Sequence, residues 1–415
     1  MAELYEIKEE IEKVILVAVA SNDGDDTVES VDELEELVKT AGAETVAKVI
    51  QNREKVHPGT YIGKGKIEEI SNLAFELGAT GIICDDELSP AQLKNLEDAL
   101  QLKVMDRTMV ILDIFAQHAS TREGKIQVEL AQLKYRSTRL IGMRNSLSRL
   151  GGGIGTKGPG EKKLEIDRRL IKDRITMLNQ ELSEIKKNRE VARQLRSKNS
   201  VPVIAIVGYT NAGKSTLLNY LTKAEVLEAD MLFATLDPTT RNLELESGQQ
   251  VLVTDTVGFI RKLPHHLIDA FRSTLEEAKY ADIILHVVDA SSPYAYKQMH
   301  IVYETLKQLQ VTDKTMITVF NKQEMVATKE PMKDLKADKT VRISAKCGNG
   351  IPELLEIIEE ILREQKTLIE HTFSYQDARN IQLIRKYGQL LIEEYREDGI
   401  FVKAYVPKDI ANRIL

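Results

Sequence analysis

The segment 203–222 constrains the fold of this sequence more than any other. An apolar run at 203–207 leads directly into GYTNAGKST at 208–216, and a stretch with helical character follows. The spacing GxxxxGK[ST] between a strand and a helix is typical of a phosphate-binding loop, where glycines let successive main-chain N–H groups converge on phosphate oxygens. Lys214 would bring positive charge to the outer phosphates, and Ser215 would offer a hydroxyl to Mg²⁺. The candidate phosphate-binding residues are Gly208, Tyr209, Thr210, Asn211, Ala212, Gly213, Lys214, Ser215 and Thr216.

A second motif follows the loop along the chain. The apolar run 251–254 ends in Asp255-Thr256-Val257-Gly258. An acidic residue at the end of a buried strand suits the surroundings of Mg²⁺, and a glycine three residues later can aim its N–H at the terminal phosphate of a nucleotide. DxxG alone is a weak signal, but its position after a phosphate-binding loop makes it a strong one.

Later strands carry a candidate site for the base. Apolar runs at 283–288 and 315–320 are followed by Asp289 and by Asn321-Lys322-Gln323-Glu324. NKxD is typical of guanine recognition, because its carboxylate accepts the N1–H and N2–H₂ of the base and so rejects adenine. Here the carboxylate belongs to Glu324, which is one methylene longer. A further run at 340–343 precedes Ser344-Ala345-Lys346, whose main-chain N–H groups could contact the base from its other side.

Four motifs in this order, each after a strand, predict the fold of the segment 199–368. We expect an α/β P-loop NTPase G domain with a doubly wound, mostly parallel sheet and its nucleotide at the carboxyl ends of the strands. Apolar runs alternating with helical stretches in 1–120 predict a smaller, acidic α/β domain before it. For 369–415 we expect a small α+β appendage, with a strand at 372–375, a helix at 378–394 and a strand at 400–406.

The segment 121–198 has a different pattern. Apolar residues at heptad spacing predict two long helices, and the glycine-rich stretch 151–160 separates them. We therefore expect an antiparallel helical hairpin with this stretch at its tip. No acidic residue falls between Glu129 and Glu161, and the basic residues near the tip are Arg144, Arg149, Lys157, Lys162 and Lys163. Such a patch in an acidic protein indicates contact with a polyanion, and the alternative is a spacer between domains.

Composition excludes several classes of protein. The sequence has no apolar stretch long enough to span a bilayer, and its acidic N-terminus lacks the layout of a signal peptide. It has two cysteines, no tryptophan and only 5% aromatic residues, which argues against a disulfide framework and against base stacking as the main means of binding. We expect a cytoplasmic monomer without stable membrane insertion and without a DNA partner.

Particular strings of this sequence resemble a known family. They are TYIGKGK (60–66), RLGGGIGTKGPGE (149–161), FATLDPTTR (233–241), DTVGF (255–259) and FVKAYVP (401–407). Together with the nucleotide motifs, they resemble the bacterial ribosome-associated GTPases of the HflX family, in the translation-factor class. The resemblance implies a GTPase that uses GTP and Mg²⁺, binds ribosomal RNA of the large ribosomal subunit, splits or rescues stalled ribosomes under stress, and is stimulated by the ribosome.

The resemblance also implies roles for particular residues. It assigns the switch threonine to Thr235, which with Ser215 would bind Mg²⁺, although chemistry alone would accept Thr239 or Thr240 equally well. Catalysis would depend on Lys214, Thr235 and Gly258. The switch segment near the nucleotide would comprise Phe233, Ala234, Thr235, Leu236 and Asp237.

The resemblance carries one further cofactor. Asn211 matches the asparagine with which potassium-stimulated relatives hold K⁺. An asparagine is also an ordinary choice in a tight loop, so both interpretations stay open.

Two departures from a typical GTPase bear on function. Phe259 occupies the position where many GTPases have a glutamine that orients the attacking water, so we expect slow hydrolysis until a partner completes the site. His265 and His266 lie nearby, and we interpret them as residues at the start of a helix and not as bases. The second departure is Glu324, which either weakens the guanine contact or relaxes selectivity against adenine.

Two alternatives to a ribosome-stimulated GTPase stay open. One is a nucleotide-dependent ribosome- or RNA-binding scaffold with little turnover, and the other is a metabolic P-loop ATPase.

Overall fold

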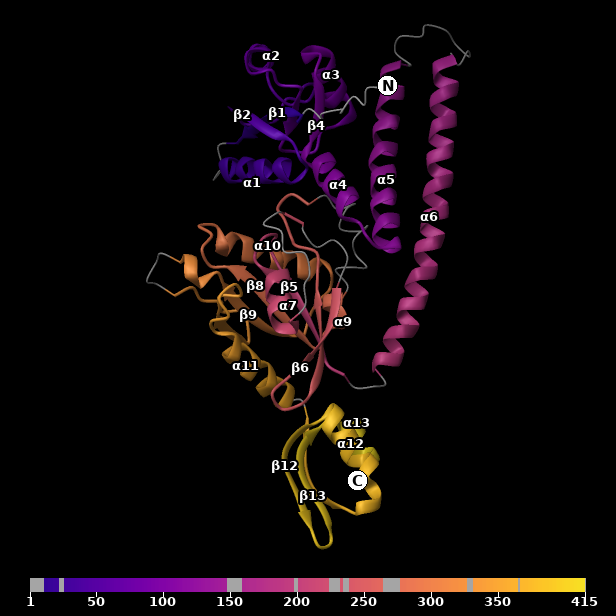
Figure 1. Ribbon diagram of the computed structural model, residues 1–415. Helices are drawn as coiled ribbons and strands as arrows, with labels where there is room; N and C mark the ends of the chain where they lie inside the picture. The colour runs from indigo at the N-terminus through magenta and orange to yellow at the C-terminus, as the bar shows by residue number, and fades with distance from the viewer. Residues whose placement is uncertain are drawn as a thin grey trace, which may run out of the picture. The chain divides into compact units, whose positions relative to one another are not determined.

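The computed structural model describes residues 11–21, 26–147, 159–197, 201–223, 232–233, 239–263, 277–326, 331–364 and 366–414 (Figure 1). The chain divides into two compact units. One comprises Met1–Glu184 with Arg261–Ala270, and the other comprises Ile185–Ile260 with Phe271–Leu415. The strands of the described residues form three sheets, one in the first unit and two in the second.

The sheet of the first unit is parallel, in the order β2-β1-β3-β4. Alternate residues of its strands face opposite sides, so Ile15 and Val17 pack with α2 and α3, and the helices α1 and α4 cover the other face. The elements are β1 (Lys13–Ala20), α1 (Thr27–Thr40), β2 (Glu44–Asn52), α2 (Lys64–Leu77), β3 (Gly81–Cys84), α3 (Pro90–Leu100), β4 (Lys103–Asp106) and α4 (Arg107–His118). The expected α/β fold of this segment is confirmed.

Two long helices follow, α5 (Arg122–Leu147) and α6 (Pro159–Ser197). They run antiparallel, because Arg174 bonds to Glu129 at 2.7 and 2.9 Å while Arg122 bonds to Glu181 at 3.2 Å (Figure 1). The two helices agree with the heptad pattern. However, α6 begins at Pro159, inside the stretch expected to be non-helical, since proline is well suited to the first turn of a helix.

The second unit contains a larger sheet in the order β10-β9-β8-β5-β7-β6, parallel except for β6. Apolar residues of α7 and α11 share one core with the strands, and α10 packs through Met299 against Val288 and Phe320 in a separate cluster. The elements are β5 (Val203–Gly208), α7 (Lys214–Thr222), β6 (Thr239–Glu244), β7 (Gln250–Asp255), α9 (Glu277–Tyr280), β8 (Ile283–Asp289), α10 (Ala295–Gln308), β9 (Thr315–Asn321), η1 (Gln323–Met325), β10 (Lys339–Arg342) and α11 (Ile351–Glu364). The expected doubly wound G domain is confirmed.

The C-terminal residues form a small antiparallel sheet in the order β11-β13-β12 with helices packed on it. The helix expected at 378–394 was wrong in its second half, which is a strand. A Cβ at Gly388 would lie 2.8 Å from Val406 Cγ1 and 2.9 Å from the Tyr405 carbonyl oxygen, so β13 approaches the backbone closely where the helix ends and the chain turns into β12. The elements are β11 (Thr367–Phe373), η2 (Tyr375–Asp377), α12 (Ala378–Tyr387), β12 (Gln389–Arg396), β13 (Gly399–Val406) and α13 (Lys408–Ile414).

A polar cluster joins the C-terminal sheet to the G domain within the second unit. One carboxylate oxygen of Glu359 accepts hydrogen bonds from the Ser247 N–H and hydroxyl at 3.0 and 2.9 Å, and the other accepts from the Gln389 amide at 3.4 Å. Lys366 donates to Gln249, which is buried in the turn between β6 and β7. Buried polar groups that bond to one another specify a single arrangement of the elements that carry them.

The structure contains, within the described ranges, no helix both long and apolar enough to cross a membrane.

A buried histidine makes the stability of the G domain sensitive to acid. Burial lowers the pKa of His286 in β8 to about 4, a shift that the nearby Lys214 reinforces and Asp334 opposes. The unfolded chain therefore takes up a proton near its ordinary pKa of 6.5 while the folded chain does not, and stability is lost as the pH falls from about 6.5 to about 4.

We expect His286→Val to remove this part of the acid sensitivity, worth about 3 kcal/mol at pH 4. The protection of the β8 amides against hydrogen exchange, compared at pH 7 and pH 4, measures this loss of stability in the G domain. Equal losses of protection in the two proteins would contradict the prediction.

Candidate nucleotide-binding site

The glycine-rich segment 208–216 runs from the end of β5 into the first turn of α7, as the sequence predicts. Lys214 is the first residue of α7, and its Nζ donates to the Tyr209 carbonyl oxygen at 2.7 Å. Only 6% of Lys214 is exposed, and burial lowers the pKa of its ammonium group to about 8, although Asp255 opposes this shift. A largely desolvated ammonium in the first turn of a helix is well suited to bind an anion.

Two side-chain oxygens that could bind a metal ion lie together near Lys214. The Ser215 hydroxyl donates to Oδ2 of Asp255 at 2.8 Å, which brings the loop and the end of β7 together. Hydroxyl and carboxylate oxygens are ligands that Mg²⁺ accepts, so the donor set fits this ion.

The side chain of Asn321 ties the phosphate-binding loop to the segment after β10. Its Nδ2 donates to the Ala212 carbonyl oxygen at 2.9 Å, and its Oδ1 accepts from the Ala345 N–H at 2.9 Å. Gly213 has a φ of 90°, and a Cβ at this position would lie 2.3 Å from Asn321 Nδ2. Glycine is therefore required here both by the backbone conformation and by the close approach.

The residues expected to recognise the base lie at the same edge of the sheet. Lys322 Nζ pairs with Asp289 Oδ2 at 2.8 Å, and Gln323 donates its N–H to the Ile343 carbonyl oxygen at 3.2 Å. Glu324 is exposed in the short helix η1. Ser344 and Ala345 are buried and Lys346 is exposed.

The segment after Asp255 is buried throughout. The Thr256 hydroxyl donates to the Ile206 carbonyl oxygen at 2.8 Å, and Val257 and Phe259 are 4% and 2% exposed. Phe259 also pairs through its main chain with the loop: its N–H donates to the Gly208 carbonyl oxygen at 3.1 Å, and its carbonyl oxygen accepts from the Thr210 N–H at 2.8 Å. The buried, apolar side chain of Phe259 therefore offers no polar group that could orient a water molecule.

Part of the expected site lies outside the described residues. Phe233 is described and is buried. The residues that lie outside the described part of the chain are Ala234, Thr235, Leu236, Asp237, His265 and His266. Thr239 and Thr240, the other candidate switch threonines, lie in β6, where the Thr240 hydroxyl bonds to that of Thr254 at 3.0 Å.

The basic residues near the hairpin tip are described only in part. Arg149 and Lys157 lie outside the described residues. Arg144 lies in α5, and Lys162 and Lys163 lie in α6. The structure describes the backbone of these three residues but not their side chains.

Sequence reasoning missed two sets of interactions. It assigned no role to Asp289, the partner of Lys322. It also passed over Arg261 and Lys262, which in the first unit pair with Asp26 at 3.0 Å and with Asp86 at 2.7 Å. No local spacing marks these pairs, because their partners are distant in the sequence.

The carboxyl ends of β3 and β4 carry the buried charges of the first unit. Arg107 is 2% exposed and bonds to Asp85 at 2.9 Å. Burial alone would raise the pKa of Asp85, but Arg107 and Lys262 hold it below its ordinary value. These charges are therefore compensated within the unit.

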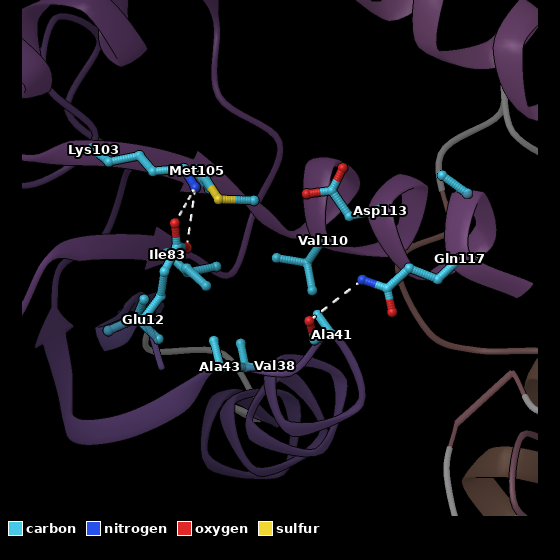
Figure 2. A pocket seen from close by; sticks show the side chains of 12 residues that line it. Glu12, Val38, Ala41, Ala43, Ile83, Lys103, Met105, Val110, Asp113 and Gln117 are labelled. Carbon is cyan, nitrogen blue, oxygen red and sulfur yellow. Dashed lines mark hydrogen bonds and ion pairs between the residues drawn. The ribbon is translucent and has the colours of Figure 1, made fainter. Parts of the chain in front are cut away.

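A hollow of about 280 Å³ lies at the amino end of the same sheet, between α1 and α4 (Figure 2). Apolar side chains such as Val38 and Val110 line it together with Asp113, whose pKa is raised by burial, and two pairs of polar groups bond on its rim. Lys103 pairs with Glu12 at 2.9 Å, and the Gln117 amide lies 3.5 Å from the Ala41 carbonyl oxygen. Nothing in this arrangement selects a ligand.

Comparison with known proteins finds matches among GTPases. Three family models match, described as "GTP-binding GTPase N-terminal" at 28–116, "GTP-binding GTPase Middle Region" at 118–196 and "50S ribosome-binding GTPase" at 203–322. A GTP-binding protein of the archaeon Sulfolobus solfataricus, solved with GDP, is similar at 25% identity and a TM-score of 0.45, over 85% of this chain and 98% of that chain.

Curated relatives match over nearly the whole length. The GTPase HflX of Lacrimispora saccharolytica is 69% identical over 99% of this chain and 97% of the relative. That of Escherichia coli K12 is 41% identical over 94% of this chain and 92% of the relative. The chain therefore belongs to the HflX family of GTPases, which bind GTP and hydrolyse it to GDP and phosphate.

Proposed function

We propose that this GTPase is a cytoplasmic switch that binds the large ribosomal subunit in its GTP form and splits or rescues stalled ribosomes under stress. Hydrolysis, stimulated by the ribosome, ends the interaction. The observation that carries the nucleotide part is the convergence of the loop, Asp255 and Asn321 at one edge of the sheet. The match to a ribosome-binding GTPase family and the basic hairpin support the ribosomal part.

In this proposal the phosphate-binding loop surrounds the outer phosphates. Main-chain N–H groups of the loop bind phosphate oxygens, and Lys214 neutralises the charge that develops on them. Ser215 and Thr235 would hold Mg²⁺, with Asp255 orienting the serine, and Asn211 would hold K⁺. Bound Mg²⁺ supplies further charge neutralisation at the phosphates. Gly258 would donate its N–H to the terminal phosphate.

Guanine would be read by the segments that Asn321 joins. The Glu324 carboxylate accepts from the N1–H and N2–H₂ of the base, and the main chain at 344–346 contacts the base from its other side. Lys322, held by Asp289, would flank the ring. The exposed position of Glu324 leaves its carboxylate free to approach the base.

Hydrolysis in the isolated protein should be slow. Phe259 is apolar and buried, so it cannot orient the attacking water, and the chain needs a partner that does so. A ribosome that supplies this group would link phosphate release to docking. This dependence also separates a ribosome-stimulated GTPase from a scaffold with little turnover.

The hairpin would carry the contact with ribosomal RNA. Its two helices bear basic residues toward a glycine-rich tip, and cations bind RNA mainly through phosphates. The contact should therefore weaken steeply as salt rises.

Co-sedimentation with purified large subunits tests this proposal. We expect association with a non-hydrolysable GTP analogue and little with GDP. Replacing Arg144, Arg149 and Lys157 together by alanine should weaken association about tenfold or more while nucleotide binding stays intact. The matched control replaces Lys172, Lys186 and Lys187, which are exposed on α6, by alanine. Equal effects of the two triple variants would count against the tip of the hairpin as the site of contact.

A second prediction concerns protonation of Lys214. Because the pKa of this ammonium group is about 8 and phosphate binding favours its charged form, GTP binding at pH 9 should take up a proton. Affinity should then fall up to about tenfold per pH unit above 8. Calorimetry at pH 7 and pH 9 in buffers of different ionisation enthalpy measures the uptake, and its absence at pH 9 would contradict the prediction.

A third prediction concerns the base. Glu324→Ala should weaken GDP binding about ten- to a hundredfold, since hydrogen bonds to a charged acceptor are lost. Glu324→Asp should retain preference for GDP over ADP. Glu353→Ala, an exposed change of equal charge in the first turn of α11, is the control. Titration with fluorescent GDP and ADP gives the affinities, and an unchanged GDP affinity in Glu324→Ala would exclude this carboxylate from recognition.

A further inference from the structure

We propose that Phe259 is a positioning residue that holds the DxxG segment against the phosphate-binding loop, and that a terminal phosphate can bind only when this contact opens. Phe259 would thus set the preference between GTP and GDP. The inference rests on the nucleotide site proposed above, and it gives a role to a residue that cannot act on the attacking water.

The contact is made by main-chain atoms. The Phe259 N–H donates to the Gly208 carbonyl oxygen at 3.1 Å, and the Thr210 N–H donates to the Phe259 carbonyl oxygen at 2.8 Å. The resulting parallel bridge between Tyr209 and Phe259 lies beyond the last paired residues of β5 and β7, Ile206 and Asp255. The pairing of the two strands therefore resumes inside the nucleotide motifs.

The same contact leaves little room beside Gly258. A Cβ at Gly258 would lie 2.8 Å from Cγ2 of Thr210, 2.9 Å from its Cα and 3.0 Å from Lys214 Nζ. Two of these distances are shorter than real Cβ contacts, and the third is as close as they come. A phosphoryl group bound between Lys214 Nζ and the Gly258 N–H is much larger than a methyl group. Because even a Cβ on Gly258 would lie this close to Thr210 and Lys214, we expect a phosphoryl group in this space to displace residues 258 and 259 from the loop.

That movement separates the bonded atoms. Phe259 is covalently adjacent to Gly258, so its carbonyl oxygen cannot stay 2.8 Å from the Thr210 N–H while Gly258 withdraws. GDP has no terminal phosphoryl group and leaves the contact in place. The nucleotide that opens the contact is the one that carries the third phosphate.

The Phe259 side chain supplies the resistance to this movement. It is 2% exposed, and every residue from Val257 to Ile260 is buried. Withdrawing the main chain moves this apolar side chain out of its packed position, which is unfavourable. Burial of the Phe259 side chain therefore stabilises the main-chain contact with the loop and so favours the binding of GDP over that of GTP.

The alternative is that the bridge only stiffens the sheet. A stiffening role predicts that loss of the side chain lowers stability and weakens both nucleotides alike. The proposed role predicts that loss of the side chain changes the ratio of the two affinities. The ratio of the affinities for GDP and for a non-hydrolysable GTP analogue therefore distinguishes the two roles.

The variant Phe259→Ala should bind the GTP analogue more tightly relative to GDP, by at least about tenfold, compared with the unchanged protein. Phe259→Leu, which keeps an apolar side chain, should retain most of the original ratio. Ile260→Ala is the matched control, because Ile260 is equally buried and its main chain makes no described bond to the loop. Titration of fluorescent nucleotides measures all four proteins.

Hydrogen exchange provides a second readout that needs no substitution. The amides of Thr210 and Phe259 should exchange slowly with GDP bound and at least about tenfold faster at Phe259 with the analogue, because its acceptor on Gly208 is lost. Equal protection at Phe259 in the two states would overturn the proposal. So would an affinity ratio that Phe259→Ala leaves unchanged or that Ile260→Ala shifts equally. If neither nucleotide binds the unchanged protein, the proposed site itself fails, which is a separate result.

Discussion

The two hydrogen bonds of the Asn321 side chain are the interaction on which the nucleotide site depends. One amide group fixes the carbonyl of Ala212 in the phosphate-binding loop and the N–H of Ala345 beyond β10. Both groups are buried, so each would lose a hydrogen-bonding partner if the asparagine were replaced. The parallel sheet brings these segments to one edge, and Asn321 determines their spacing. Gly213 completes the arrangement, since no other residue fits beneath the amide.

Sequence patterns predicted the parts of the fold whose signal is local. The phosphate-binding loop, Asp255 and Asn321 each follow an apolar run, and the sheet places them together as expected. The edge strand β6 was not predicted, because its mostly exposed residues show no buried alternation. The end of α12 was also missed, because it depends on the close approach of Gly388 to residues distant in sequence.

Side-chain partnerships were harder to foresee than elements. The pairing of Lys322 with Asp289 requires that β8 and β9 be neighbours, which the apolar runs alone do not establish. The pairs of Arg261 with Asp26 and of Lys262 with Asp86 join segments far apart in the chain. The boundary between the two compact units falls between Ile260 and Arg261, so the main-chain bonds of Phe259 and these ion pairs belong to different units although they are close in sequence.

A phenylalanine in place of a glutamine has two physical consequences at once. A polar side chain at this position would have to reach solvent or a bonding partner, and it could then orient a water molecule. A buried phenylalanine does neither, and the same burial holds its main chain against Gly208 and Thr210. In the proposals made above, slow intrinsic hydrolysis and resistance to the terminal phosphate therefore have one cause. A partner that moves residue 259 out of its buried position would relieve the resistance and could supply the missing polar group in the same step.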